Sequence, residues 1–534
     1  MAASLGVVTP NQHEQIKSAI FTHLKENEVF SSLKEIISSV IGGDGSGTAS
    51  EAVIAAARHK SILSRVVADE AGGGTSSSAL AAQNPEGRMM MHLMLLGGRA
   101  FSRPEAAIEG GGSSDDTVCV CLHFGAQRFR SKPVPYSEEP ALRDGILFEL
   151  PLPDAETSKA IAEADYPSDA MLAQLRGTFR TAPPMHLLVV KKQASDGREV
   201  LLSSSMLEWR QVLHQGKATL AVELPGIGAE SSYPIGCLEL RLELMPLPIP
   251  ESRMTEADVE LGVRREREAQ VEVERRFFAY SRSWWTSYIE ASPAHAQRPV
   301  KLFALSELGT QRPVTAFVQP LQTGRLIESP LQAAHFVALL AHTRDHAAGS
   351  SVSDVWHTVH SVLATRSGET EEHALLLCSL LLGFGLDAYV CIGTDGRGPH
   401  VWVATFDAEG RATFWESLSG QQYPADGGSG HPYLTLACVF SHAAFYANVQ
   451  PSTKLSQTSL ALSEPTAWKA MDPSFLTTIT PLPCAPLQPS TVRDHAAVAA
   501  ATEAELRTLI DEHRKAFNRS VPGVQWDENL CAPI

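Results

Sequence analysis

The chain has 534 residues, of which 44% are hydrophobic, and it carries a formal net charge of −16 at pH 7. A chain longer than about 250–300 residues outgrows a single hydrophobic core, so several domains are expected. The acidic balance excludes nucleic acid as a partner, because binding to a phosphate backbone needs clustered Lys and Arg.

The sequence predicts a cytosolic protein with reduced thiols. Residues Met1–Leu5 lack the basic and then apolar layout of a secretory signal. The longest apolar run, Ala374–Phe384, falls short of the roughly 20 residues that span a bilayer. Eight cysteines spread over so long a chain do not form a disulfide framework. The last residues, Cys531–Ile534, have the outline of a prenylation box, but Ile534 is not a usual terminal residue, and we do not favour prenylation.

Residues 1–70 are predicted to be helical, and residues 71–86 are predicted to be a linker. Apolar side chains recur at helical spacing in the first segment, for example at Phe30, Leu33 and Ile37. Such a small helical unit buries little area by itself, so its apolar stripe is expected to pack on the rest of the protein or on a partner chain, which includes self-association. The linker is rich in Gly, Ser and Ala, which is typical of a flexible connection.

Residues 87–250 are predicted to form an antiparallel β-sandwich, because short β-like runs alternate there with turn residues. The runs are Met89–Leu96, Val118–Phe124, Gln127–Lys132, Gly145–Leu150, Met185–Lys192, Glu199–Ser204, Thr219–Leu224 and Ile235–Leu244. Cys119 and Cys121 share one face of a strand, since side chains alternate along a strand. A structural zinc site needs four ligands, and these thiols supply only two. We therefore interpret them as packing residues.

A sandwich of this kind raises the question of a C2 domain that binds calcium and lipid. Calcium needs six to eight oxygen ligands, supplied by carboxylates that converge from several loops. The candidate loops offer Asp115 and Asp116 together and Asp196 elsewhere. These acids are too few, so we expect no calcium-dependent membrane binding and interpret the sandwich as an interaction module.

Residues 251–296 are predicted to be a charged connecting helix. Its mixed charges suit a solvated face with partners three or four residues apart. Trp284 and Trp285 follow towards the carboxyl end of this segment, with Tyr288 just beyond them. Large aromatic side chains are usually packed, so this end of the helix is expected to anchor against the next domain.

Residues 297–450 are predicted to form an α+β domain like those of transglutaminases and papain-like peptidases, with a Pro-rich linker and a final helix at 451–534. The polar loop Gly368–Ala374 opens a strongly apolar helix. Strands then follow, one of which begins at His400 and the next of which ends at Glu416. In these folds a helix N-terminus brings a nucleophile close to a histidine and an acid from neighbouring strands.

Thr370 holds the position expected for the nucleophile, so Thr370, His400 and Glu416 form a vestigial triad without a catalytic residue. Thr370 is an alcohol without a terminal amine to activate it, and we interpret it as a helix cap. Trp402 and Trp415 are candidates to line the remaining cleft.

Two thiols, Cys378 and Cys391, are alternative nucleophiles, but each lies among apolar residues and is interpreted as core. His373 is interpreted as a structural histidine. His342 and His346 have the spacing of helical metal ligands without an evident third ligand, so no metal and no cofactor are expected.

Several strings resemble the centrosomal protein of 76 kDa family. The strings are Glu372–Thr394, Phe414–Gly420, Arg298–Ala304, Gly324–Leu326, Phe129–Pro135, Asn27–Ile37 and Ile510–Lys515. This resemblance covers nearly the whole chain. It implies N-terminal helices, a C2-like sandwich and a transglutaminase-like peptidase domain, and thus a multidomain α+β fold.

The resemblance also implies a function without catalysis. The expected role is that of a scaffold of the centriole or basal body that limits centriole duplication and binds a centriole distal-end capping protein. The expected location is the cytoplasm and cytoskeleton, at the centrosome, centriole or ciliary basal body. The chain departs from the family pattern at Thr370, where the family has a cysteine. The alternative hypothesis is an active cysteine hydrolase or transglutaminase-like enzyme.

Overall fold

The computed structural model describes residues 89–101, 115–152, 154–324, 326–343, 355–425, 430–479 and 486–487, together with positions 504, 507, 508, 510–512 and 515. The predicted N-terminal helices, the linker at 71–86, His346 and Cys531 lie outside these residues. None of the described helices is both long and apolar enough to cross a membrane.

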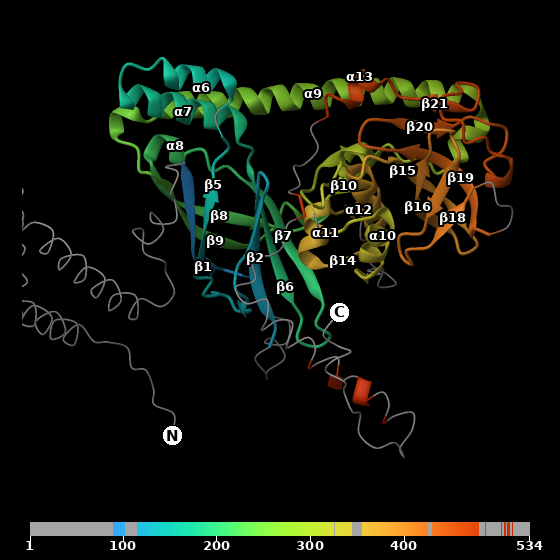
Figure 1. Ribbon diagram of the computed structural model, residues 1–534, viewed down its shortest axis with the longest axis horizontal. Coiled ribbons are helices and arrows are strands. Elements are labelled where there is room, and N and C mark those ends of the chain that lie inside the picture. Colours follow the sequence, from blue (N-terminus) through green and yellow to red (C-terminus); the bar gives the residue numbers. More distant parts are fainter. Residues whose placement is uncertain are drawn as a thin grey trace, which may run out of the picture. The chain divides into compact units, whose positions relative to one another are not determined.

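The first part of the described chain is the predicted β-sandwich (Figure 1). One sheet has the strand order β5-β1-β9-β8, and the second has the order β3-β2-β6-β7 with β4 paired to β2. The strands are β1 Met90–Arg99, β2 Thr117–Phe124, β3 Gln127–Arg130, β4 Val134–Pro135, β5 Asp144–Glu149, β6 Met185–Lys192, β7 Glu199–Leu207, β8 Lys217–Pro225 and β9 Pro234–Met245.

Each of the eight predicted β-like runs is found as a strand, but the helices between β5 and β6 were not predicted. These helices are α6, Ala155–Ala162, and α7, Pro167–Thr181, and a short α8, Val212–Gln215, follows later in the chain. In α7 only Leu175, Gly177 and Thr178 are buried. A helix with so narrow an apolar stripe gives a weak periodic signal in the sequence.

Strands β2 and β6 are buried on both faces, which is unusual for an outer layer of a sandwich. Val120 and Leu187 point into the core between the two sheets. The residues that alternate with them, such as Cys121 and Leu188, pack in a separate apolar cluster with Ala364 from a later helix. Because side chains alternate across a strand, burial of both sets means that a further layer covers the outer face.

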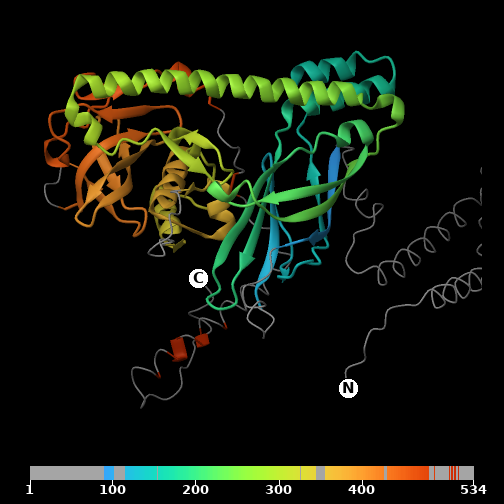
Figure 2. The same ribbon diagram turned by 180° about the vertical axis from the view of Figure 1, so that it is seen from behind.

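The predicted charged helix is α9, Glu256–Ala291, which spans 36 residues and is seen from both sides in Figures 1 and 2. Near its start Val259 belongs to the sandwich core. Near its end Trp284 and Tyr288 belong to the core of the C-terminal domain. The Nε1 of Trp284 donates to Ala470 O at 2.9 Å, so the aromatic end is anchored as predicted.

The C-terminal domain has a seven-stranded antiparallel sheet with the order β18-β17-β16-β15-β19-β20-β21. Its strands are β15 Asp387–Asp395, β16 Pro399–Phe406, β17 Ala412–Trp415, β18 Gln422–Pro424, β19 Tyr433–Phe440, β20 Phe445–Asn448 and β21 Trp468–Ala470. The edge strand β21 lies within 451–534, so part of the segment interpreted as a linker extends the sheet.

Short strands and helices precede and cover this sheet. They are β10 Phe303–Ser306, β11 Gln311–Pro313, α10 Pro330–Ala338, β12 Ala341–His342, β13 Val355–Trp356, α11 Val359–Thr365, β14 Ser367–Gly368, α12 Thr370–Gly383 and α13 Pro473–Leu476. Helix α12 is buried nearly all round, with Leu376, Leu377 and Leu380 in the domain core. An apolar helix of this length is stable only when other elements surround it, and α12 packs against α10, β15 and β16.

Candidate functional site

The predicted helix start is found, but Thr370 is not its cap. Glu369 is the N-cap residue and Thr370 is the first residue of α12. The carboxylate of Glu372 accepts from the backbone N–H of Glu369 at 2.8 Å, which satisfies one of the N–H groups left open at a helix start. The side chain of Thr370 is instead within hydrogen-bond distance of His342, with 3.2 Å between Oγ1 and Nε2.

The structure brings His400 and Glu416 together. His400 is the second residue of β16, Glu416 follows the end of β17, and these two strands are neighbours in the sheet. The Nε2 atom of His400 lies 2.8 Å from Oε2 of Glu416. The same carboxylate accepts from Tyr433 Oη at 3.1 Å and from the N–H of Leu418 at 3.3 Å. This is the arrangement in which an acid orients a histidine.

The charges around His400 favour its protonated form. Burial lowers the pKa of its imidazole, but the hydrogen bond and charge of Glu416, and the charges of Asp395 and Glu371, raise it above its ordinary value. Glu371 follows Thr370 in α12, so the helix start lies within electrostatic range of His400. Only the neutral form of a histidine acts as a general base, and a raised pKa moves the appearance of that form to higher pH.

The thiols near this site are inert core residues. Cys378 and Cys391 are fully buried, and burial is the largest cause that raises the pKa of each thiol far above its ordinary value. Since the thiolate is the nucleophilic form, neither thiol is activated. Cys438 is also buried, and burial raises its pKa to about 12.

The two tryptophans predicted to line a cleft do not do so. Trp402 has no exposed surface and stacks on Tyr433 with ring centroids 4.2 Å apart. Trp415 is 6% exposed and donates from Nε1 to Thr405 Oγ1 at 2.9 Å. The two rings lie on opposite faces of the sheet, and each belongs to a packed core cluster. A ligand would therefore not reach either ring.

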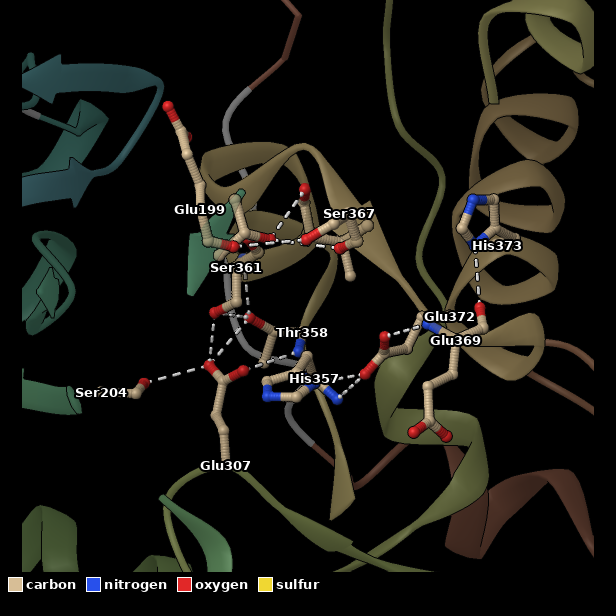
Figure 3. Close-up of polar contacts among 12 residues, drawn as sticks. Glu199, Ser204, Glu307, His357, Thr358, Ser361, Ser367, Glu369, Glu372 and His373 are labelled. Carbon is tan, nitrogen blue, oxygen red and sulfur yellow. Dashed lines mark hydrogen bonds and ion pairs between the residues drawn. The ribbon is translucent and has the colours of Figure 1, made fainter. Parts of the chain in front are cut away.

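His373 is structural, as predicted, since its Nδ1 lies 2.8 Å from the carbonyl oxygen of Glu369. A second histidine near the helix start was missed. His357 forms an ion pair with the buried Glu372 (Figure 3). Burial opposes protonation of His357, but Glu372 raises its pKa to about 9. His357 and Glu372 come from different elements, and nothing in their sequence spacing indicates the pair.

Glu307 is a fully buried carboxylate that the sequence analysis also missed. Its Oε1 accepts from Ser361 Oγ at 2.7 Å and from Thr358 Oγ1 at 3.0 Å, at the start of α11. It also accepts from Ser204 Oγ of β7 in the sandwich at 3.0 Å (Figure 3). Glu307 therefore links the sandwich to the C-terminal domain.

The charge of Glu307 is stabilised in spite of its burial. Burial raises the pKa of this carboxyl, but the hydrogen bonds of His186 and Ser361 and the charge of His357 outweigh burial and lower the pKa below its ordinary value. A buried carboxylate with several donors stays ionised.

Two of the three acids considered for calcium, Asp116 and Asp196, are held by other partners. Asp116 pairs with Lys191 at 2.8 Å and accepts from the N–H of Ala194 at 2.9 Å. Asp196 accepts from the N–H of Arg198 at 3.0 Å and pairs with its guanidinium at 3.2 Å.

Comparison with known families assigns both domains. Residues 82–249 match the family described as the CEP76 C2 domain, and residues 354–471 match the CEP76 peptidase-like domain. The protein named centrosomal protein of 76 kDa is 34% identical in Homo sapiens and 33% identical in Danio rerio, each over 98% of this chain and over 83% and 84% of the relative. The Xenopus laevis protein of the same name is 38% identical over 83% of this chain and 68% of the relative. The chain therefore belongs to the centrosomal protein of 76 kDa family, with a C2 domain followed by a peptidase-like domain.

Proposed function

We propose that this protein is a non-catalytic scaffold of the centriole or basal body that limits centriole duplication through protein–protein contacts. Membership of a family named for the centrosome supports the location. The raised pKa values of Cys378, Cys391 and Cys438, the thiols of the described part of the peptidase-like domain, support the lack of catalysis. The peptidase-like domain then serves as a binding and structural module.

The observation that carries this proposal is the chemistry at the start of α12. The acid and histidine of a thiol peptidase are paired 2.8 Å apart in His400 and Glu416, but an alcohol, Thr370, stands at the first residue of the helix. Removing the nucleophile from a working triad typically costs on the order of 10⁶ in turnover. Glu371 and Glu372 in the first turn would in addition repel a thiolate or an oxyanion.

The partners that we propose are proteins, among them a centriole distal-end capping protein. Two of the three candidate calcium ligands of the C2 domain, Asp116 and Asp196, are held in ion pairs and backbone hydrogen bonds, which favours a protein-binding role over a calcium-dependent membrane role. Self-association through residues 1–70 is a further part of the proposal.

The test is to tag the chain at its native locus and to image it against a centriole marker after detergent extraction. We expect discrete spots retained on centrioles or basal bodies. We also expect supernumerary centrioles when the protein is depleted, and a normal number when the wild-type chain is restored. A diffuse signal that detergent removes entirely would contradict the proposal.

Rescue with Cys378→Ala and with Cys391→Ala distinguishes the scaffold from the alternative, an active cysteine hydrolase or transglutaminase-like enzyme. Both side chains are small and buried, so each substitution removes one thiol at a modest packing cost. We expect each variant to restore centriole number as well as the wild type does. Loss of rescue by a variant that accumulates to normal levels would instead support thiol catalysis.

A further inference from the structure

Three buried histidines meet where α11 covers the outer face of the C2 sandwich. They are His123 of β2 and His186 of β6, each 1% exposed, and His360 of α11, which is 4% exposed. One ring nitrogen of each lies within 4.8 Å of the others. The three residues lie far apart in the sequence, so no motif of fixed spacing predicts the cluster.

The sheet register fixes two of the three side chains. His123 and His186 are direct partners across the antiparallel pair β2 and β6. Side chains at such positions stand on the same face, about 4.5–5.5 Å apart at Cβ. His360 lies over both, with its ring centroid 4.6 Å from that of His123 and 5.2 Å from that of His186.

Hydrogen bonds of His123 and His186 fix which nitrogen of each ring carries the proton in the neutral form. The Nε2 of His123 lies 2.9 Å from Gly125 O, and a carbonyl only accepts, so this nitrogen is protonated. The Nε2 of His186 lies 2.7 Å from Ser204 Oγ, whose own proton goes to Glu307 at 3.0 Å. Ser204 must therefore accept from His186, and its Nε2 is protonated too. In both rings the lone pair is on Nδ1.

These lone pairs have no partner among the described residues. Nδ1 of His123, Nδ1 of His186 and both nitrogens of His360 are buried without a hydrogen bond in the described chain. Unpaired buried polar atoms are rare in proteins and call for an explanation. Three neighbouring imidazoles from three elements, each with an unpaired ring nitrogen, offer the donor set of a metal ion.

We propose that His123, His186 and His360 bind a divalent transition-metal ion, with zinc as the natural occupant, which clamps the C2 domain to the peptidase-like domain. Imidazole suits zinc, and three protein ligands leave one tetrahedral position for water. Bonds of about 2.0–2.1 Å imply a separation between ligand nitrogens of roughly 3.3 Å, so binding draws the three rings together.

The surroundings resemble the outer shell of a histidine metal site. Metal-bound histidines usually donate their other N–H to a carbonyl or carboxylate, which fixes the ring and raises its basicity. His123 donates to a carbonyl, and His186 faces both Ser204 and Glu307, whose Oε1 lies 3.3 Å from Nε2. Zinc binds the neutral form of an imidazole, in which one ring nitrogen keeps its lone pair.

One nearby charge opposes the metal. Arg128 of β3 is the direct partner of His123 across β2 and β3, so its side chain stands on the same face of the sheet. The ionised Glu307, behind His186, offsets this cation. The buried carboxylate thus has a second role, which is to balance the charge of the ion.

The first measurement is the metal content of the full-length protein, purified without a histidine tag or chelator. We expect about one zinc per chain by elemental analysis, and loss of that zinc in His123→Ala and His360→Ala. The matched control is His92→Ala, which removes a buried histidine from the other sheet. Metal content that is substoichiometric in the wild type, or equal in the variants and the control, would overturn the proposal.

Cobalt spectroscopy on the wild-type chain keeps the test decisive if the variants fail to fold. Co²⁺ added to the metal-free protein is expected to give the visible spectrum of a tetrahedral site with nitrogen and oxygen ligands. A sulfur-to-cobalt charge-transfer band would assign the metal to thiols such as Cys119 and Cys121, and would overturn the proposal. So would a spectrum of hexa-aqua Co²⁺, which would indicate that water alone fills the cluster.

Ser204→Ala tests the outer shell, since Ser204 acts through His186. Loss of such a partner typically weakens metal binding about 10–100-fold. We expect the affinity for Co²⁺ to fall by this factor while the visible spectrum stays tetrahedral. An unchanged affinity would contradict the role of Ser204 as a positioning residue.

Discussion

At the scale of single residues, His357 couples the start of α12 to pH. Its imidazolium is bound by Glu372, which also accepts from the backbone N–H of His357 at 2.9 Å. The folded protein therefore holds this proton more tightly than the unfolded chain, in which a histidine has a pKa near 6.5. The pair contributes its full stabilisation below about pH 6.5, and this contribution is lost as the pH rises through about 9.

We predict that Glu372→Gln removes much of the decline in stability between about pH 6.5 and 9. The shift of the pKa of His357 corresponds to about 1–2 kcal/mol once solvent screening of its partly exposed ring is allowed for. Thermal unfolding at a series of pH values measures the effect. The matched control is Glu371→Gln, which removes a carboxylate from the same helical turn but keeps the pair. Equal pH profiles for the two variants would contradict the prediction.

Some residues of the candidate site could be predicted from the sequence, and others could not. His400 and Glu416 were predicted because each sits at the end of a strand in a known pattern, and adjacent strands bring them together. Trp402 and Trp415 were predicted to be accessible because they are neighbours of that pair. Both are buried because other elements cover each face of the sheet at their positions. The local sequence does not indicate which elements cover a strand.

At the scale of elements, the carboxyl end of α9 carries much of the packing on the peptidase-like domain. Trp284 is 6% exposed, stacks on Tyr288 at 5.6 Å and meets Phe445 edge-on at 5.7 Å. Its indole N–H also donates a hydrogen bond to the carbonyl of Ala470, the last residue of the edge strand β21. The aromatic end of a helix with mixed charges thus fixes that helix to the domain that follows it.

We predict that Trp284→Ala lowers the free energy of unfolding of the C-terminal domain by about 3–5 kcal/mol, the usual cost of removing a large buried aromatic side chain. Phe278→Ala on the same helix is the matched control, because Phe278 is 59% exposed. A surface change of this kind is expected to stay within about 0.5 kcal/mol. The free energy of unfolding of the two variants is measured by urea unfolding, with hydrogen exchange in β20 and β21 as the readout. Similar midpoints for the two variants would refute the role of the anchor.

Strands and helices differed in how well the sequence predicted them. The strands of the sandwich were found because alternation and turn residues mark each one locally. Helices α6 and α7 were missed because they bury few side chains, and strand β21 was missed because three residues carry almost no periodic signal. A short element that forms only because neighbouring elements pack or pair with it cannot be predicted from the local sequence pattern.

At the scale of the whole molecule, the contact between the C2 and peptidase-like domains combines an apolar cluster with a buried polar one. Cys119 and Cys121 were interpreted as packing residues, and they do pack in the apolar part of this contact, with Leu188 and Val190. Glu307 and the three histidines lie beside this apolar part and join segments far apart in the chain. Such long-range contacts leave no trace in sequence spacing, which is why the junction was not predicted.

Glu307 is the residue on which this junction depends most. It accepts from the backbone N–H of Thr358 at 3.0 Å and from hydroxyl groups of both domains, so its removal leaves several buried donors without an acceptor. Losing one partner of a buried charged network typically costs about 3–5 kcal/mol. Replacement by an apolar residue would not restore these hydrogen bonds.

We therefore predict that Glu307→Ala loosens the two domains before it unfolds either one. Hydrogen exchange should rise first in α11 and in β6 and β7, while β15 and β16 in the centre of the C-terminal sheet stay protected. Glu409→Ala is the matched control, since Glu409 is a carboxylate on the surface with 66% of its side chain exposed. If exchange in Glu307→Ala rose evenly over both domains, the carboxylate would be supporting the folds themselves. If it rose nowhere, the apolar cluster around Cys121 and Leu188 would be sufficient to hold the domains together.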